Sequence, residues 1–184
     1  WDEGNPKNAF HKAIKFSKGD FLAFCDCDDF WDQNKLNKQL QFMKKLNISA
    51  CHTSYNIINY HGKIIGEMKA KPQLNYNNLL NSCDIGLSTV IIRKKLIINS
   101  KIFFPNIKTK EDYILWLKLA KTGVIFFGFN EKLTNWRKLK NSLSDSVIQK
   151  IFDGYRVYNT YLNYGFIKSV FRLFILAVNS ILKK

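Results

Sequence analysis

The chain has 184 residues and a formal net charge of +15, with 46% hydrophobic and 23% charged residues. This composition fits one globular domain with a sizeable core and excludes a disordered chain. The basic charge favours anionic partners such as phosphorylated substrates, an acidic lipid surface or nucleic acid, although the lysines are scattered and form no compact run. Four cysteines, Cys25, Cys27, Cys51 and Cys83, follow neither a disulfide framework nor a zinc-ligand spacing, which favours a reducing compartment.

The first third of the chain predicts a helix, a strand and a second helix. Apolar residues at helical spacing predict an amphipathic helix over residues 6–16. The continuous apolar run over residues 21–25 predicts a short strand that is buried on both faces. Leucine and methionine at helical spacing then predict a helix over residues 33–46, with Asp32 as its N-cap.

The middle of the chain predicts further strands around one buried helix. Residues 48–65 are β-prone and contain the turn Asn59-Tyr60-His61-Gly62, which predicts a hairpin. An apolar helix is expected over residues 111–121, with the acidic pair Glu111-Asp112 in its first turn, where the helix dipole favours negative charge. Other expected strands are residues 87–92, 124–129 and 132–136.

The end of the chain has a different pattern. Residues 146–164 are expected to be helical, and the strongly apolar residues 166–182 contain Lys168 and Arg172. This second stretch is marginal for crossing a bilayer. Several apolar side chains share one helical face: Phe166, Val170, Phe174, Ala177, Val178 and Ile181. Two interpretations stay open, a helix that lies in a membrane interface and a helix that docks on the domain or on a partner chain.

The predicted strand at residues 21–25 ends in the acidic sequence Asp26-Cys27-Asp28-Asp29. Strand ends are where ligands bind in open α/β sheets, and alternate residues of an extended chain point the same way. Asp26 and Asp28 would therefore repel each other unless a cation lies nearby. Because carboxylates and phosphate oxygens together hold Mg²⁺ or Mn²⁺, this pattern predicts a metal site that a diphosphate completes. The alternative is a polar loop whose acids only cap a helix.

Four segments resemble family 2 glycosyltransferases. Residues 19–31, GDFLAFCDCDDFW, resemble the family segment GDYIAFxDxDDxW, and residues 110–117, KEDYILWL, contain its EDxxLWL helix. Residues 133–144 resemble its LxxYRxxxxSxS segment, and residues 86–90 resemble its acceptor-side strand. The likeness covers about residues 5–145, and the four motifs occur in the family's order, which makes it specific.

The resemblance implies an α/β fold of the GT-A type, in which helices flank a Rossmann-like mixed sheet. Residues 1–144 would form the carboxyl-terminal two-thirds of the catalytic domain, because the family's first nucleotide-binding strand and loops have no counterpart before Trp1. Residues 145–184 would form a helical tail, with possible membrane contact.

The resemblance also implies roles for five residues. Asp26 would contact the nucleotide, and Asp28 would bind Mg²⁺ or Mn²⁺ at the diphosphate. Asp112 would act as the general base toward the acceptor hydroxyl, with Glu111 orienting it or bonding the acceptor. Arg137 would reach the diphosphate or close a loop over it.

The implied function is an inverting glycosyltransferase of bacterial surface-polysaccharide synthesis. It would use a nucleotide-diphospho-sugar donor and a glycan or lipid-linked acceptor, and nucleic acid would not be a partner. The expected location is the cytoplasm, at the inner face of the membrane, where the basic tail would meet anionic lipid. Two alternatives are a basic nucleic-acid-binding protein or metal-dependent nuclease, and an inactive fragment.

Overall fold

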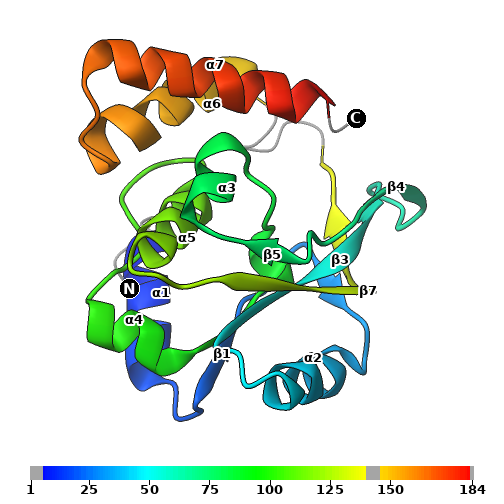
Figure 1. The fold of residues 1–184 in the computed structure, drawn as a ribbon. Coiled ribbons are helices and arrows are strands. Elements are labelled where there is room, and N and C mark those ends of the chain that lie inside the picture. The colour runs from blue at the N-terminus through cyan, green and yellow to red at the C-terminus, as the bar shows by residue number, and fades with distance from the viewer. Residues whose placement is uncertain (1–5, 140–145, 183–184) are drawn as a thin grey trace.

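The computed structural model describes residues 6–139 and 146–182. Figure 1 shows a curled mixed sheet with helices around it, and two C-terminal helices that lie together across one side of the domain. The expected α/β architecture is therefore confirmed. The predicted boundary between residues 144 and 145, and the serine part of the last motif, lie outside the described residues.

The sheet runs in the order β1-β6-β3-β7-β2, with β4 beside β3 and β5 beside β7. The strands are β1 (Phe21–Ala23), β2 (Phe30–Trp31), β3 (Ala50–Ile58), β4 (Ile64–Met68), β5 (Gln73–Leu74), β6 (Ile91–Arg93) and β7 (Phe126–Arg137). The long β3 and β7 are parallel, and the other pairs are antiparallel. The predicted hairpin is confirmed as β3–β4. Its turn has Gly62 at a φ of +81°, a conformation that favours glycine.

All the expected helices form. The helices are α1 (Pro6–Phe16), α2 (Lys35–Lys45), α3 (Tyr76–Asn81), α4 (Lys94–Ser100), α5 (Glu111–Lys121), α6 (Val147–Arg156) and α7 (Phe166–Leu182). A 3₁₀ turn, η1 (Leu87–Thr89), precedes β6, and a π-helical turn, η3 (Val157–Tyr161), follows α6. In the described part of the chain, no helix has the length and apolar character needed to cross a membrane.

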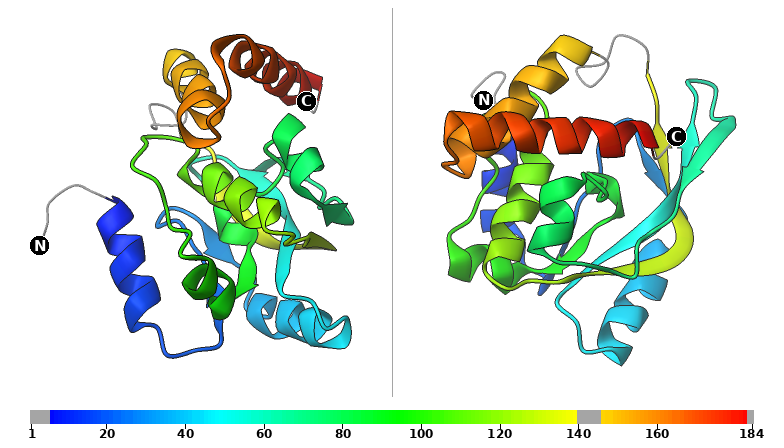
Figure 2. Two further views of the ribbon diagram at one scale, coloured as in Figure 1. Left: turned by 60° about the vertical axis from the view of Figure 1, so that its left-hand side comes forward. Right: turned by 45° about the horizontal axis from the view of Figure 1, so that its top comes forward.

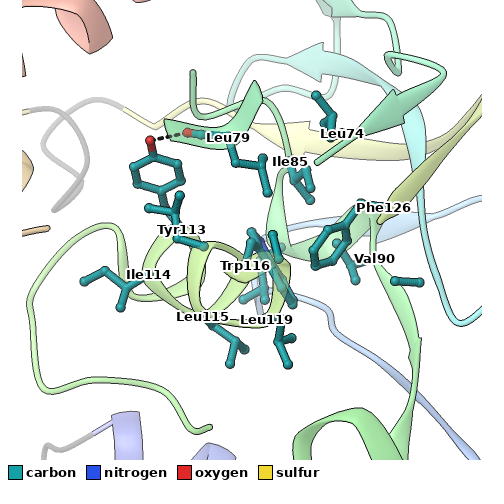
Figure 3. Packing of buried hydrophobic residues seen from close by; sticks show 14 of the residues in the cluster. Leu74, Leu79, Ile85, Val90, Tyr113, Ile114, Leu115, Trp116, Leu119 and Phe126 are labelled. Carbon is teal, nitrogen blue, oxygen red and sulfur yellow. Dashed lines mark hydrogen bonds between the residues drawn. The ribbon is translucent and has the colours of Figure 1, made fainter. Parts of the chain in front are cut away.

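Helix α5 lies at the centre of the hydrophobic core, as Figure 3 shows. Trp116 is fully buried, with its ring edge-on to Phe24 and Phe126 at centroid distances of 5.8 and 5.4 Å. The Tyr113 hydroxyl donates a hydrogen bond to the Leu79 carbonyl oxygen, which ties α5 to α3 (Figure 3). This packing fixes the first turn of α5, which carries Glu111.

Three strand predictions need correction. Strand β1 is buried on one face only, since Leu22 is buried whereas the next residue, Ala23, points to the opposite face and is exposed. The strand expected over residues 87–92 begins with the 3₁₀ turn η1, because side chains and not a strand ladder bond the Ser88 carbonyl. The two strands expected over residues 124–136 are one strand, β7, with an irregular register against β3.

Helix α2 begins two residues later than predicted, and of its apolar residues at helical spacing only Leu40 and Met43 pack in the core. Its cap position is Asn34, and the Asp32 carboxylate accepts a hydrogen bond from the Asn34 N–H at 2.8 Å just before the helix. The buried face carries Lys35, Gln39 and Met43, whereas the leucine at position 36 is exposed. Polar side chains can occupy this face because they bond one another and the sheet.

Candidate active site

The acidic loop between β1 and β2 is held by hydrogen bonds from both sides. On one side, the Asp26 N–H donates to the Ser88 hydroxyl at 2.9 Å, and the Trp31 indole N–H donates to the Ser88 carbonyl at 2.8 Å. On the other side, the Arg137 N–H of β7 donates to Asp29 Oδ1 at 2.8 Å. These bonds hold the backbone at Asp26 and the Asp29 carboxylate in defined positions although both lie in a loop.

A cavity of about 260 Å³ opens beside this loop. Asp26 from the loop and Asp112 from the first turn of α5 both line it, with Ser88, Tyr55 and Trp136. The structure thus brings together two predicted site residues that are far apart in the sequence. Three other predicted site residues, Asp28, Glu111 and Arg137, are not among the lining residues.

A larger cavity of about 580 Å³ lies elsewhere, at the start of β1. Its lining includes Lys18, Asp20, Arg93 and Lys94 and none of the predicted site residues. The smaller cavity is the candidate active site because the acids of two motifs meet there.

The acids around the smaller cavity affect one another's ionisation. Burial raises the pKa of Asp26 to about 7, and the nearby charges of Asp29, Asp112 and Asp28 add to this effect. Burial and the charge of Asp112 likewise raise the pKa of Glu111 to about 7. Burial also raises the pKa of Asp112. A raised pKa makes a carboxylate a stronger base, which suits proton abstraction near neutral pH.

The donor set fits a divalent cation that is held jointly with a substrate. No group of three or more His, Cys, Asp or Glu side chains within residues 6–139 and 146–182 is arranged to hold a metal ion. Mg²⁺ and Mn²⁺ sites at diphosphates commonly use only one or two carboxylates, with phosphate oxygens as the other ligands. Asp29 Oδ2 is buried without a hydrogen-bond partner among the described residues, so an acceptor is free there for a cation or a ligand donor.

Arg137 braces the acidic loop in this structure. Its guanidinium donates to the Asp28 carbonyl at 2.9 Å, and to the carbonyls of Asn59 and Tyr60 at 3.1 and 2.7 Å. These bonds connect the loop with the β3–β4 turn. The expected contact of Arg137 with a diphosphate stays a prediction.

The comparisons with known proteins agree with this geometry. Residues 2–103 match the family described as Glycosyl transferase family 2. Over 177 residues the chain is 31% identical to TuaG of Bacillus subtilis, named as a teichuronic acid biosynthesis glycosyltransferase, and covers 69% of that protein. The chain belongs to glycosyltransferase family 2. This confirms the resemblance, and it favours a transferase over a nucleic-acid-binding protein.

Two further comparisons concern substrates and fold. The domain is 42% identical over 117 residues to WfgD of Escherichia coli, and the match covers 64% of this chain and 45% of WfgD. The full name of WfgD is UDP-Glc:alpha-D-GlcNAc-diphosphoundecaprenol beta-1,3-glucosyltransferase. It superposes on S. aureus TarS 1-349 in complex with UDP-GlcNAc with a TM-score of 0.65 at 20% identity, over 86% of this chain and 46% of that one. The expected GT-A fold is confirmed. This family 2 domain spans less than half of WfgD and of that TarS chain.

The sequence motifs did not reveal the residues that hold the site together. The Gln39 amide donates to the carbonyls of Cys51 and Thr89 at 3.2 and 3.0 Å, and accepts from the Lys35 ammonium at 2.9 Å. Burial lowers the pKa of Lys35 to about 8. In the sequence, the only indication of this role is that Lys35 and Gln39 lie four residues apart on a helix that follows the acidic motif. Together with Ser88, these two residues position η1 against the acidic loop of the family 2 domain.

Proposed function

We propose that this family 2 domain transfers a sugar from a nucleotide-diphospho-sugar to a hydroxyl of a glycan or lipid-linked acceptor in bacterial surface-polysaccharide synthesis. The observation that carries the proposal is the meeting of Asp26 and Asp112 in one cavity. The names of relatives favour a UDP-sugar donor and an acceptor linked to diphosphoundecaprenol. Such an acceptor would place the reaction at the inner face of the cytoplasmic membrane.

On the donor side, Asp26 binds the nucleotide and Asp28 is the proposed ligand of Mg²⁺ or Mn²⁺. When bound, such an ion neutralises charge on the departing diphosphate. The crowding of Asp26, Asp28 and Asp29 supports this role, because like charges at a strand end favour a bound cation. Arg137 keeps the loop in place through the Asp28 carbonyl.

On the acceptor side, Asp112 acts as the general base. Its carboxylate takes the proton of the acceptor hydroxyl as that oxygen forms a bond to the anomeric carbon. The bond from this carbon to the diphosphate oxygen breaks, and its electron pair leaves with the nucleoside diphosphate. One such displacement inverts the anomeric configuration. Glu111, beside Asp112 in the first turn of α5, orients the base or bonds the acceptor.

The test is release of nucleoside diphosphate from UDP-sugars in the presence of a diphosphoundecaprenol-linked GlcNAc acceptor, with and without Mn²⁺. We expect Asp112→Asn to lower kcat by roughly 10²–10⁴-fold, and Asp28→Ala to abolish the response to metal. Asp20→Asn is the matched control, because Asp20 lines the other cavity. Burial raises the pKa of Asp112 and raises that of Glu111 to about 7, so kcat should fall as the pH is lowered and these groups take up protons.

Unchanged turnover in Asp112→Asn would remove the proposed base. If no donor is turned over while the protein binds nucleic acid in a salt-sensitive way, the basic nucleic-acid-binding alternative is correct instead. If neither activity is present although the chain folds, it is an inactive fragment of a transferase.

A further inference from the structure

Helix α7 docks on the domain through its polar side. The Arg172 guanidinium donates to Asn81 Oδ1 at 2.7 Å, and the Asn179 amide donates to the Asn81 carbonyl at 2.8 Å. Ser169 and Leu176 are buried on the same side of the helix. An amphipathic helix that covers a core normally buries its apolar side, so this orientation is reversed.

The opposite side of α7 is apolar and exposed. At 3.6 residues per turn, the exposed apolar residues of α7 fall on one continuous side of the helix. They include Phe166, Ile167, Val170, Phe171, Phe174 and Ile181. Phe171 and Phe174 are 61% and 65% exposed, so large aromatic rings point away from the domain.

Helix α6 extends this surface. Its exposed apolar residues are Val147, Ile148, Ile151 and Phe152. The helices pack closely, because a Cβ atom added at Gly154 of α6 would lie 2.8 Å from Leu173 of α7. Figures 1 and 2 show them side by side on one side of the domain in every view. We call the exposed apolar residues of the two helices the α6–α7 face. Exposed apolar residues gathered on two helices that pack together favour an interaction site.

Charge distinguishes among the possible occupants of this face. Residues 146–184 contain six cationic side chains and one acid, Asp153. Asp153 is fully buried and accepts hydrogen bonds from the N–H and hydroxyl of Thr109. The described tail therefore exposes lysines such as Lys150 and Lys168 and no carboxylate. A second copy of a chain with net charge +15 would be repelled, whereas an anionic surface would be attracted.

We propose that the α6–α7 face binds the interface of an anionic lipid bilayer. Its apolar side chains enter the boundary between headgroups and acyl chains, and Lys150 and Lys168 lie among the anionic headgroups. Binding of lipid does not depend on sugar transfer. Lipid binding by the α6–α7 face deepens the proposed function, because it would hold the active site beside a membrane-borne acceptor.

The test is flotation of the full chain with vesicles that contain phosphatidylglycerol and with vesicles of phosphatidylcholine alone. We expect flotation with the anionic vesicles, weakened by added salt. The double variant Phe171→Asp/Phe174→Asp should lower the bound fraction by about tenfold or more, because charged groups oppose insertion. The matched control is Ile64→Asp/Ile65→Asp, since these β4 residues are similarly exposed, at 58% and 52%, and lie outside the face.

Three outcomes would overturn the proposal. The first is that the chain does not float with vesicles, and the second is that the two double variants float equally. The third is that the chain binds no vesicles but forms a dimer, and that Phe171→Asp/Phe174→Asp abolishes this dimer. The last result would make a second copy the occupant. Thermal unfolding of both variants checks that they fold. Turnover of a water-soluble acceptor by the same variants separates failure of lipid binding from failure of the proposed transferase.

Discussion

Helices α5 and α7 are both rich in apolar residues, but they use them in opposite ways. In α5 the run from Tyr113 to Leu117 is fully buried, and the polar first turn reaches the candidate active site. In α7 the polar Arg172 and Asn179 contact the domain, and phenylalanines point outward. Apolar composition alone therefore does not determine which side of a helix is buried.

The difference follows from what each helix is packed against. Helix α5 lies in the main hydrophobic cluster, where burial of each large side chain contributes about 1.5–3 kcal/mol. Helix α7 contacts α3, whose end presents the amide and carbonyl of Asn81. Hydrogen bonds, together with burial of Leu176 in the main hydrophobic cluster, thus fix the orientation of α7 and leave most of its apolar side available for another partner.

The largest expected effect separates the two helices directly. Trp116→Ala removes a fully buried indole, so we expect the free energy of unfolding to fall by about 3–5 kcal/mol. Phe174→Ala removes a ring that is 65% exposed, so a change within about 0.5 kcal/mol is expected. Urea unfolding of both variants measures this. Equal losses would show that Phe174 is buried in solution and would contradict the comparison.

A pH-dependent effect is expected in the core and not in the tail. His52 of β3 is buried, and burial lowers its pKa to about 4, whereas the 146–184 segment has no histidine. The folded state therefore favours neutral His52. Its contribution to stability is complete above the unfolded pKa of 6.5 and is lost as pH falls toward 4, by about 3 kcal/mol in total.

Thermal unfolding between pH 7 and pH 4 tests this expectation, with His52→Gln compared with the parent chain. The loss of stability on acidification should be smaller in His52→Gln. His61→Gln is the control, because His61 is exposed in the β3–β4 turn. An identical pH dependence in parent and His52→Gln would show that folding does not lower the pKa of His52.

Local patterns predicted much of the fold and the two acids that meet in the cavity. Asp26 follows an apolar run and Asp112 begins an apolar helix, so each was visible from its neighbours in sequence. Strand ends and helix starts are local features, and the sheet then brings them together.

Features that depend on distant partners could not be read in this way. Ser88 belongs to a 3₁₀ turn because its carbonyl accepts bonds from Trp31 and Thr134, which lie elsewhere in the chain. Lys35 is buried because Gln39 and the Trp31 ring receive its ammonium group. The outward direction of the α7 phenylalanines likewise depends on Asn81. In each case a polar contact with a residue far away in the sequence decides the local structure or the side that is buried.

The last prediction has the smallest expected effect of the three and concerns the contact between α6 and the start of α5. Buried Asp153 of α6 accepts hydrogen bonds from the Thr109 N–H and hydroxyl at 3.0 and 2.9 Å, two residues before Glu111. In Asp153→Asn the shape is kept but the charge and one acceptor are lost. We expect the free energy of unfolding to fall by about 1–3 kcal/mol, and kcat to fall more than KM changes, because the start of α5 loses its support. Gln149→Ala, which removes only a more exposed donor to Asp153, is the matched variant and should have a smaller effect. If Asp153→Asn matches Gln149→Ala in both stability and kcat, the tail does not support the start of α5. Lipid binding by the α6–α7 face would then locate the active site at the membrane without stabilising the catalytic base.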